Sequence, residues 1–544
     1  MKYVFSTKHT EFFDEASSAN QLSVISETLL GRSGYGDTTP YRKVEANLKT
    51  DNRLSKDKWE TTLNANGRYL EQSEIPADPL RRGFDVANWT LTGAYKGEKG
   101  KAKLSLGDIL FNESPYTIYG LSRKGSLFEG EYDGYYAKAF MLRSEQSFGL
   151  DGGIGTSGAT GDRIFGTVLG AKFFEQKMEV RATYLDGGDA STFSAATPVT
   201  SPESTYGIST LPGQKRGQVL DFLVSTNFFD NRLKMEGEAA FSDYSPDTGS
   251  GARFRRDAAY RFKAEGVQGI YSYGALYEYI GRNFGTVGNQ SAERDKQRAV
   301  VTNGLSFEKQ SVNLTLSRLN DNVRKDSLFG QNIGYNGNLV YSYTGIQNMP
   351  ITFGYVKDLQ RSHGDPNVRI NKDGDIITGS ISYSEGPWLL GFAPAFSHVN
   401  DKASTDADIQ MMSYSFTPAY SGETFSISSN LTFSRSFTSV PHVSKDTYTV
   451  GLNVRKDLLD KRLVFDSANT FTREHGDHNS AKLESLYLTG TVSYNLKQYL
   501  GNAVEPTVGL RASYLRIKDR INSINDKEES RFFLVLTLAA PFFF

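Results

Sequence analysis

Apolar and polar residues alternate with a period of two along nearly the whole chain, and this pattern constrains the fold more than any other feature. In "SLYLTGTVSYNL" (485–496), Leu486 and Leu488 fall on one side of an extended chain, while Tyr487 and Thr489 fall on the other. The alternation recurs in "KMEVRATY" and "TFSISSNLTFS". Because successive side chains of a β-strand point to opposite faces, each segment is predicted to be a strand with one apolar and one polar face. No stretch of comparable length has the period of an amphipathic helix.

The connections between these strands alternate in length. Tight links such as "EKGK" (98–101) and "SGE" (421–423) alternate with long polar links such as "FSDYSPDTGSGARFRRD", and the longest runs from about residue 186 to 217. Short turns on one rim and long loops on the other are typical of a bacterial outer-membrane barrel. The predicted fold is therefore all-β: a single large transmembrane antiparallel β-barrel with short periplasmic turns and long extracellular loops.

About 26 strands fit between Gln21 and Pro541 when they are counted backwards from the C-terminus. A further candidate, "KYVFSTKHTEFF", is left out because closed single-chain bacterial barrels usually have an even number of strands. We expect residues 1–19 to form an N-terminal segment in the periplasm or in the lumen, and residues 20–544 to form the barrel.

Composition excludes several classes of function. The chain has 61 basic and 62 acidic residues, so nothing in its charge points to a nucleic-acid partner. It has no cysteine, which excludes disulfides, thiolate metal sites and covalent haem attachment on this chain. We expect no cofactor and no enzymatic activity. No apolar run is long enough for a transmembrane helix, and the start lacks the apolar stretch of a signal peptide, so we expect a mature sequence behind an added Met1.

The last residues, "RFFLVLTLAAPFFF", place apolar side chains at every second position. The residues on this alternating face are Phe532, Leu534, Leu536, Leu538, Ala540, Phe542 and Phe544. The pattern resembles the C-terminal signal by which the barrel-assembly machinery recognises outer-membrane barrels, so this machinery is an expected partner, as is outer-membrane lipid. Pro541 and the second apolar face (Phe533, Val535) depart from the pattern. The alternative is a buried strand of a soluble sheet.

The opposite faces of the predicted strands should line the lumen. The charged candidates in the first half of the chain are Lys43, Glu45, Lys49, Lys101, Lys103, Glu129, Glu131, Glu179, Arg181, Lys234, Glu236, Glu238, Arg261, Lys263 and Glu265. The second half is milder, with positions such as Ser413, Ser415, Thr449 and Thr491. Because the charges are balanced, strong selectivity for small ions is not indicated. The charges either form cross-strand ion pairs in a water-filled interior or dock a partner or cargo.

Three other segments are weaker candidates. The link after Gly107–Asp108 breaks the alternation and is either an outer loop or a loop folded into the barrel. His363-Gly-Asp365 and "EHGDH" (474–478) combine acid–base groups or possible metal ligands, but residues of this kind in polar loops are usually only solvated. "NKDGD" (371–375) looks like a fragment of an oxygen-ligand calcium loop without its distal Glu.

The chain as a whole resembles Gram-negative outer-membrane β-barrels, without a family-specific motif. In strand number it is closest to the sheath barrels of porin–cytochrome conduits, some of which carry a CxxC that is absent here, and to the lipopolysaccharide-inserting barrels. Members of the second family are expected to carry cysteines and a fused periplasmic domain. Neither is seen in this sequence, which argues against that family. The resemblance implies a channel that acts as a conduit or sheath for a lumen-filling or periplasmic protein partner, or for a cargo such as an exported polymer. The alternatives are a general diffusion porin narrowed by inward-folded loops, and an outer-membrane enzyme or adhesin using its outer loops.

Overall fold

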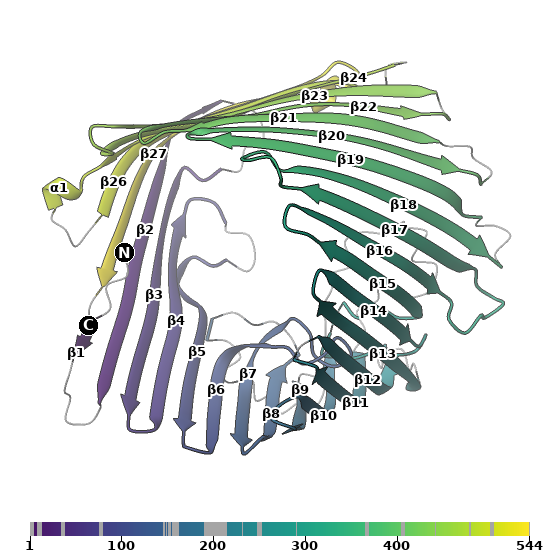
Figure 1. Ribbon diagram of the computed structural model, residues 1–544. Coiled ribbons are helices and arrows are strands. Elements are labelled where there is room, and N and C mark those ends of the chain that lie inside the picture. Colours follow the sequence, from purple (N-terminus) through teal and green to yellow (C-terminus); the bar gives the residue numbers. More distant parts are fainter. Residues whose placement is uncertain are drawn as a thin grey trace.

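Most of the described residues belong to one continuous antiparallel sheet (Figure 1). The structure is a computed structural model. It describes residues 5–7, 14–33, 39–75, 80–144, 147, 149–150, 154, 163–189, 215–230, 232–246, 253–289, 291–364, 369–403, 408–440, 442–477, 480–500 and 505–542.

The strands follow one another along the chain. In the first half they are β1 Phe5–Thr7, β2 Glu15–Ser33, β3 Arg42–Lys56, β4 Trp59–Gln72, β5 Gly83–Lys96, β6 Gly100–Phe111, β7 Leu121–Tyr132, β8 Tyr135–Arg143, β9 Arg163–Phe173, β10 Met178–Asp189, β11 Lys215–Phe228, β12 Leu233–Ser245, β13 Arg255–Gln268 and β14 Tyr271–Ile280. In the second half they are β15 Lys296–Ser306, β16 Gln310–Asp321, β17 Gln331–Tyr343, β18 Ile351–His363, β19 Asn371–Glu385, β20 Trp388–Asp401, β21 Ile409–Ser421, β22 Phe425–Thr438, β23 Val443–Leu458, β24 Leu463–Gly476, β25 Lys482–Asn495, β26 Glu505–Asp519 and β27 Lys527–Phe542. Two short helices, α1 Lys497–Leu500 and a 3-10 turn Ser523–Asn525, lie in connections.

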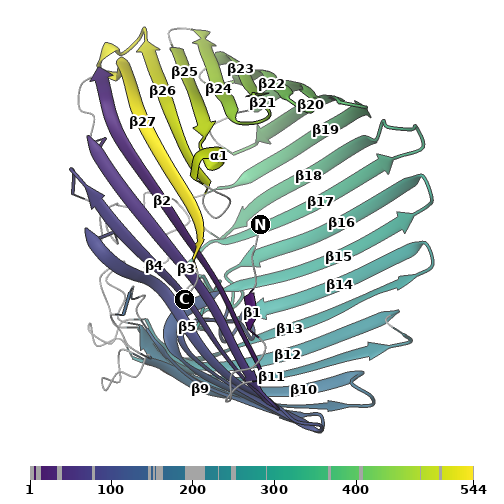
Figure 2. The ribbon, with the colours of Figure 1, turned by 90° about the vertical axis from the view of Figure 1, so that its left-hand side faces the viewer.

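The sheet closes on itself. Strands β2 to β27 each pair with their sequence neighbours, and β27 pairs with β2 from Asn20–Phe542 to Ser33–Ser530 (Figure 2). This closure confirms the predicted fold, a single barrel with 26 strands. The first barrel strand begins at Glu15 rather than at residue 20, because residues 15–19 pair with β3 although their sequence does not alternate.

The N-terminal strand β1 extends the same seam. Its residues 5–7 pair with residues 16–18 of β2, directly beyond the point at which β27 ends against Asn20. This short strand lies within "KYVFSTKHTEFF" (2–13), the further strand candidate in the sequence. Residues 1–4 and 8–13 lie outside the described part of the chain, so the expected location of residues 1–19 in the periplasm or lumen stays a prediction.

Short and long connections alternate as expected from β2 to β17. Farther along the chain the difference is no longer regular, and the link 496–504 after β25 is longer than the link 439–442 after β22. Strands β3 and β4 are joined by two residues, as are β7 and β8, whereas β6 and β7 are joined by residues 112–120. Asp133 and Gly134 both have positive φ, as a two-residue hairpin turn with the twist of the sheet requires. We call the two ends of the barrel the short-turn rim and the long-loop rim; in outer-membrane barrels these are periplasmic and extracellular.

The two faces of the wall differ in chemistry. On β11, Leu220 and Phe222 are 41% and 46% exposed, while Val219 and Asp221, which point to the opposite face, are buried. Large aromatic residues are exposed at the short-turn rim, among them Tyr135, Phe174 and Phe229. An apolar outward band flanked by aromatic residues is the surface that a barrel presents to lipid. Among the described residues, no helix is long and apolar enough to cross a membrane.

The last strand shows why its apolar pattern is doubled. Phe532 and Leu536 are exposed on the outward face, with Leu534 and Leu538 half-exposed between the other residues of that face. Phe533 points to the opposite face and is only 5% exposed, with the guanidinium of Arg511 4.6 Å from its ring centroid. The side chain of Phe542 and all of Phe544 lie outside the described residues.

A buried ion pair fixes the corner between β5, β6 and β7. Gly107 has a φ of +105°, and a Cβ there would lie 2.3 Å from the carbonyl oxygen of Trp89, so only glycine fits. The next residue, Asp108, accepts hydrogen bonds from the Trp89 backbone N–H and from Lys124 Nζ, both at 2.8 Å. The Lys124 side chain is completely buried. A charge in such a place is tolerated only because its partner is present.

Removing this lysine should destabilise the barrel. We expect Lys124→Met to lower the free energy of unfolding by about 3 kcal/mol, because Asp108 loses its buried partner. Urea unfolding in detergent, followed by tryptophan fluorescence, measures this. The matched control is Lys101→Met, since Lys101 makes a 2.9 Å ion pair with Glu131 but its side chain is 64% exposed; the expected loss is below about 1 kcal/mol. Equal losses would show that the corner does not depend on the buried pair.

Candidate functional site

The polar face of the sheet is continuous around the barrel. Residues directly opposite each other in a β-ladder point to the same face, so the pairing can be followed from strand to strand. One row of opposed residues reads Gly170, Arg181, Leu223, Glu238, Arg261, Glu278 and Arg298. Followed in the same way, all fifteen charged candidates lie on this one face, opposite to the apolar band. That they line a passage for cargo stays a prediction.

Most of these charges are paired, either across neighbouring strands or with the next inward residue of the same strand. Lys103 lies 3.2 Å from Glu129. Arg261 lies 2.7 Å from Glu238 and also pairs with Glu236. Further pairs join Lys101 to Glu131, Lys43 to Glu45, and Lys263 to Glu265, at 2.7 to 2.9 Å. The remaining four candidates, Lys49, Glu179, Arg181 and Lys234, lie on the same face. Glu179 accepts a hydrogen bond from Tyr136, and Arg181 lies 3.2 Å from Glu113. The paired arrangement leaves the first half of the wall charged but locally neutral.

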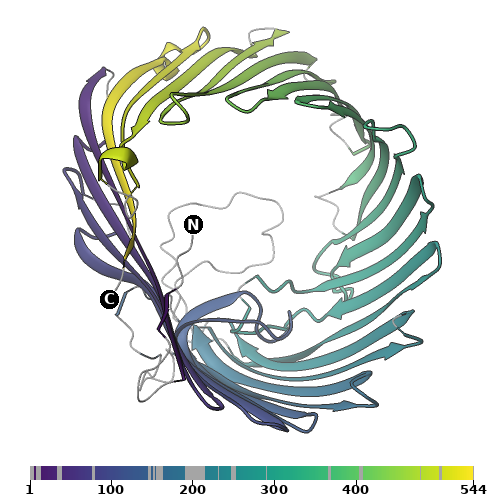
Figure 3. The same cartoon turned by 60° about the vertical axis from the view of Figure 1, so that its left-hand side comes forward.

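Residues 112–120, which we call the inward segment, turn from β6 onto this polar face instead of projecting outward (Figure 3). Glu113 forms ion pairs with Lys138 at 2.6 Å and Arg181 at 3.2 Å, both on the inner wall. Ser114 donates a hydrogen bond to Glu238, and Tyr116 donates one to Glu278 at 2.8 Å. Of the two alternatives for this link, the inward-folded loop is therefore the one observed.

A second connection, residues 281–295 between β14 and β15, packs against the inward segment. Thr286 donates to the carbonyl oxygen of Thr117 at 2.8 Å, and the Asn289 amide donates to that of Pro115 at 2.7 Å. The Tyr119 backbone N–H donates to Gly288. These contacts satisfy backbone carbonyls that the segment leaves without strand partners.

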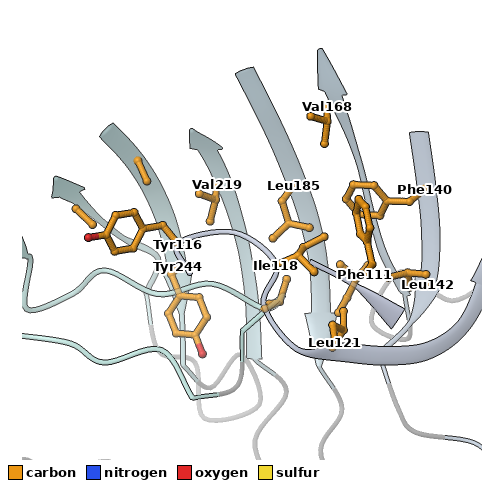
Figure 4. Close-up of a cluster of buried hydrophobic side chains, with 14 of the residues drawn as sticks. Phe111, Tyr116, Ile118, Leu121, Phe140, Leu142, Val168, Leu185, Val219 and Tyr244 are labelled. Atoms are coloured by element: carbon orange, nitrogen blue, oxygen red, sulfur yellow. The ribbon is translucent and has the colours of Figure 1, made fainter. Parts of the chain in front are cut away.

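A hydrophobic cluster holds both connections against the wall (Figure 4). Ile118 and Phe284 are fully buried. Ile118 lies beside the inward side chain of Leu185 (Figure 4), and the ring of Phe284 packs edge-on against that of Tyr116, with ring centroids 5.8 Å apart. Burying apolar side chains of this size contributes about 1.5 to 3 kcal/mol each. The connections are therefore packed like a small protein core and are not loose loops in the lumen.

The buried hydroxyl of Tyr116 acts as a hydrogen-bond donor to Glu278. Its burial and the nearby carboxylate of Glu278 raise the pKa of Tyr116 far above the ordinary value for a tyrosine. The phenol therefore stays protonated and remains a hydrogen-bond donor to Glu278 throughout the physiological pH range. Glu278 also lies 2.8 Å from Arg298, which links the segment to β15.

The histidine motifs do not form a site in the described residues. His363 ends β18 and His475 lies on β24, so the two are six strands apart. His475 lies opposite Asp446 on the outward face, and Asp477 accepts a hydrogen bond from Ser444. Asp365 and His478 lie outside the described residues. Within the described ranges, no group of three or more His, Asp or Glu residues could hold a metal ion.

The "NKDGD" stretch is not a calcium loop. Residues 371–375 are the start of β19, and their carboxylates are already taken. Asp373 pairs with Lys357 and with Lys402, and Asp375 pairs with Lys357 at 2.9 Å. The lysine on the neighbouring strand thus occupies the place that a cation would take.

The decisive observation is the combination of these two faces in a closed sheet. Within a bilayer every backbone N–H and C=O must be bonded inside the protein, and a closed antiparallel barrel with an apolar outer band and a polar interior meets that requirement. The chain is a Gram-negative outer-membrane β-barrel. Its polar face encloses the lumen of a channel.

Comparisons with known proteins add nothing on function. No protein-family model matches the sequence, and no curated protein sequence is detectably similar to it. Among solved structures, the siderophore receptor PirA from Pseudomonas aeruginosa aligns at 8% identity and a TM-score of 0.40, over 97% of this chain and 80% of that one. The P pilus usher PapC translocation pore aligns at 10% identity and a TM-score of 0.34, over 97% of this chain and 99% of that one. A BenF-like porin from Pseudomonas fluorescens Pf-5 aligns at 8% identity and a TM-score of 0.29, over 98% of this chain and 100% of that one. At these TM-scores the similarities carry no argument, so the identification depends on the barrel itself.

Loosening the inward segment should be measurable without harming the barrel. We expect Tyr116→Phe to raise hydrogen exchange of the amides in residues 112–120 about tenfold, because Glu278 loses a buried donor at a cost of roughly 1.4 kcal/mol. The matched control is Tyr119→Phe, since Tyr119 is in the same segment but 57% exposed, whereas Tyr116 is 2% exposed. Unchanged exchange in Tyr116→Phe would mean that the apolar cluster alone holds the segment.

Proposed function

We propose that this barrel is a conduit: a partner protein or a passing cargo occupies its lumen as it crosses the outer membrane. The observation that carries the proposal is the number of strands in the closed wall. Twenty-six strands about 4.8 Å apart and tilted about 40° give a backbone diameter of roughly 50 Å if the barrel is circular. Barrels of about 16–18 strands already hold an aqueous channel, and those of about 22 strands carry a plug.

Within the described part of the chain, the inward connections cover one side of this interior. The buried cluster that holds them involves strands from β6 to β14 and the connection that follows β14. An uncovered lumen of this width would let solutes leak across the outer membrane. This argument supports an occupant in the lumen. A multihaem cytochrome held in a sheath and an exported polymer are the two occupants that the fold suggests.

The mechanism is passive and needs no reacting group. The apolar band holds the wall in lipid, and the paired charges of the lumen keep the passage hydrated without a strong field of either sign. Rigid strands rather than loops form most of the wall, so the passage keeps its shape while cargo moves. The proposal therefore assigns no catalytic residue.

A second candidate function is a general diffusion porin. The inward segment and residues 281–295 favour it, because they narrow the lumen with the protein's own chain. An enzyme or adhesin that uses the outer loops is the third class. Full function after replacement of His363, Asp365, His475 and Asp477 would remove its catalytic version.

Conductance of the isolated barrel separates the first two candidates. In a planar bilayer, we expect the purified protein to conduct at least about twice as well as a porin of 16–18 strands, because the cross-section grows with the square of the strand number. A conductance equal to or below that of the smaller porin would favour a lumen closed by its own loops.

Purification in mild detergent from native outer membranes then identifies the occupant. Mass spectrometry of the intact complex is the measurement. A partner with haem absorbance indicates an electron-conducting sheath, and a partner without haem indicates export. A barrel without any partner, in a preparation in which known complexes survive, contradicts a permanently held protein.

The seam between β2 and β27 should not open during function. Glu27 reaches across it to Arg511 at 3.0 Å. Thr28 and Leu534 lie directly opposite each other in the ladder, and the chain contains no cysteine. We expect a disulfide introduced as Thr28→Cys with Leu534→Cys to leave conductance unchanged, with the reduced double variant as the control. A loss of transport on oxidation would indicate a lateral gate, as in a barrel that inserts lipid.

A further inference from the structure

One part of the inner wall carries no charge between the two rims. Across β20–β25 (green to yellow in Figure 3), one row of opposed inward residues reads Ala393, Ser415, Thr432, Thr449, Thr472 and Ser485. A second row, nearer the short-turn rim, reads Leu389, Ala419, Ser428, Asn453 and Ala468. We call the inward-facing residues of β20–β25 between the rim charges the neutral wall.

The charges next to the neutral wall are confined to the rims and are paired there. Lys445 lies 3.1 Å from Glu474 toward the long-loop rim. Arg455 lies 3.1 Å from Asp457 and 3.5 Å from Asp466 toward the short-turn rim. The contrast is with β6–β14, where charges occur at mid-height and the inward segment covers them. The two sides of the lumen therefore present different chemistry.

Most side chains of the neutral wall are short, and several are hydrogen-bonded to one another. Asn430 accepts hydrogen bonds from Ser415 at 3.2 Å and Thr432 at 3.1 Å, and the Thr449 and Thr472 hydroxyls are 3.4 Å apart. Each hydroxyl or amide keeps further donor or acceptor capacity toward the lumen. Two larger inward side chains are Tyr487, 44% exposed, and Leu389 on β20, 47% exposed.

This composition does not suit a tight protein interface. Such interfaces are enriched in Tyr, Trp, Phe, Met and Arg, and depleted in Ser and Ala, and a few buried aromatic or Arg anchors dominate their affinity. The neutral wall offers hydroxyls over six strands with one aromatic ring. Hydrogen bonds of this kind are worth only about 0.5 to 1.5 kcal/mol each after exchange with water, so contacts along the wall are weak and easily replaced.

We propose that the neutral wall is the track along which an uncharged, polyhydroxylated polymer, such as a neutral polysaccharide, slides through the barrel. The inference rests on the proposed conduit function and names its cargo. Hydroxyls of the polymer exchange water for the Ser, Thr and Asn groups at nearly equal energy, so the chain is guided without being held. A polyanion finds no unpaired cation on this wall.

Single-channel recording with two probes tests the assignment. Neutral dextran and dextran sulfate of the same chain length are added to the full barrel in a planar bilayer, and the residence time of each current blockade is measured. We expect the residence time of dextran to be at least about three times that of dextran sulfate, the effect of roughly one net hydrogen bond.

A charge placed in the neutral wall should reverse the preference. We expect Thr449→Lys to lengthen the residence of dextran sulfate about fivefold, as one exposed ion pair would, and not that of dextran. The matched control is Thr449→Gln, which places a longer but uncharged side chain at the same inward position, so no lengthening is expected.

Three results would overturn the inference, and they can be told apart. Equal residence times of dextran and dextran sulfate in the wild-type barrel refute the track while the conductance still supports a conduit. A co-purifying protein that Thr449→Lys releases and Thr449→Gln does not would make the neutral wall a protein interface. A wild-type barrel that does not conduct removes the proposed function and this inference with it.

Discussion

The pairing of β27 with β2 is the contact on which the rest of the structure depends. Lipid offers no hydrogen bonds to a strand edge, so the two terminal strands must satisfy each other, and they do so from Asn20 to Ser33. The Glu27–Arg511 ion pair reinforces the same seam from the lumen side. Closure of the sheet explains the alternation of apolar and polar residues, because one face must suit lipid and the other must suit water or an occupant.

Closure at this strand number creates a second requirement, which the lumen meets unevenly. The wall from β6 to β14 carries ion pairs and is covered by two connections with their own hydrophobic packing. The wall from β20 to β25 is neutral between its rims, and the two packed connections do not reach it. The covered side reduces the opening, and the neutral side is left for contact with a passing molecule. This asymmetry is the strongest structural clue to function, since the fold comparisons carry none.

Much of this architecture could be predicted from alternation alone. The strand number and the common face of the fifteen charged candidates follow from a period of two, which is a local property. The inward segment could not be predicted in this way, because its partners Glu238 and Glu278 are 124 and 162 residues distant along the chain. The non-alternating apolar residues Phe111 and Ile118 were the available signal. The calcium-loop interpretation of 371–375 failed for a similar reason, since Lys357 belongs to another strand.

The lengths of the strands make the barrel taller than the bilayer. A 14-residue strand such as β22, tilted about 40°, rises roughly 36 Å, whereas the apolar band of such barrels is about 25 Å tall. The surplus forms a rigid collar in water, and the paired Lys357, Asp373 and Asp375 at the long-loop end of the wall belong to it. A molecule in transit would therefore enter a stiff-walled tunnel before it reaches the level of the lipid, and hydrogen-bonded strands rather than loops would align it there.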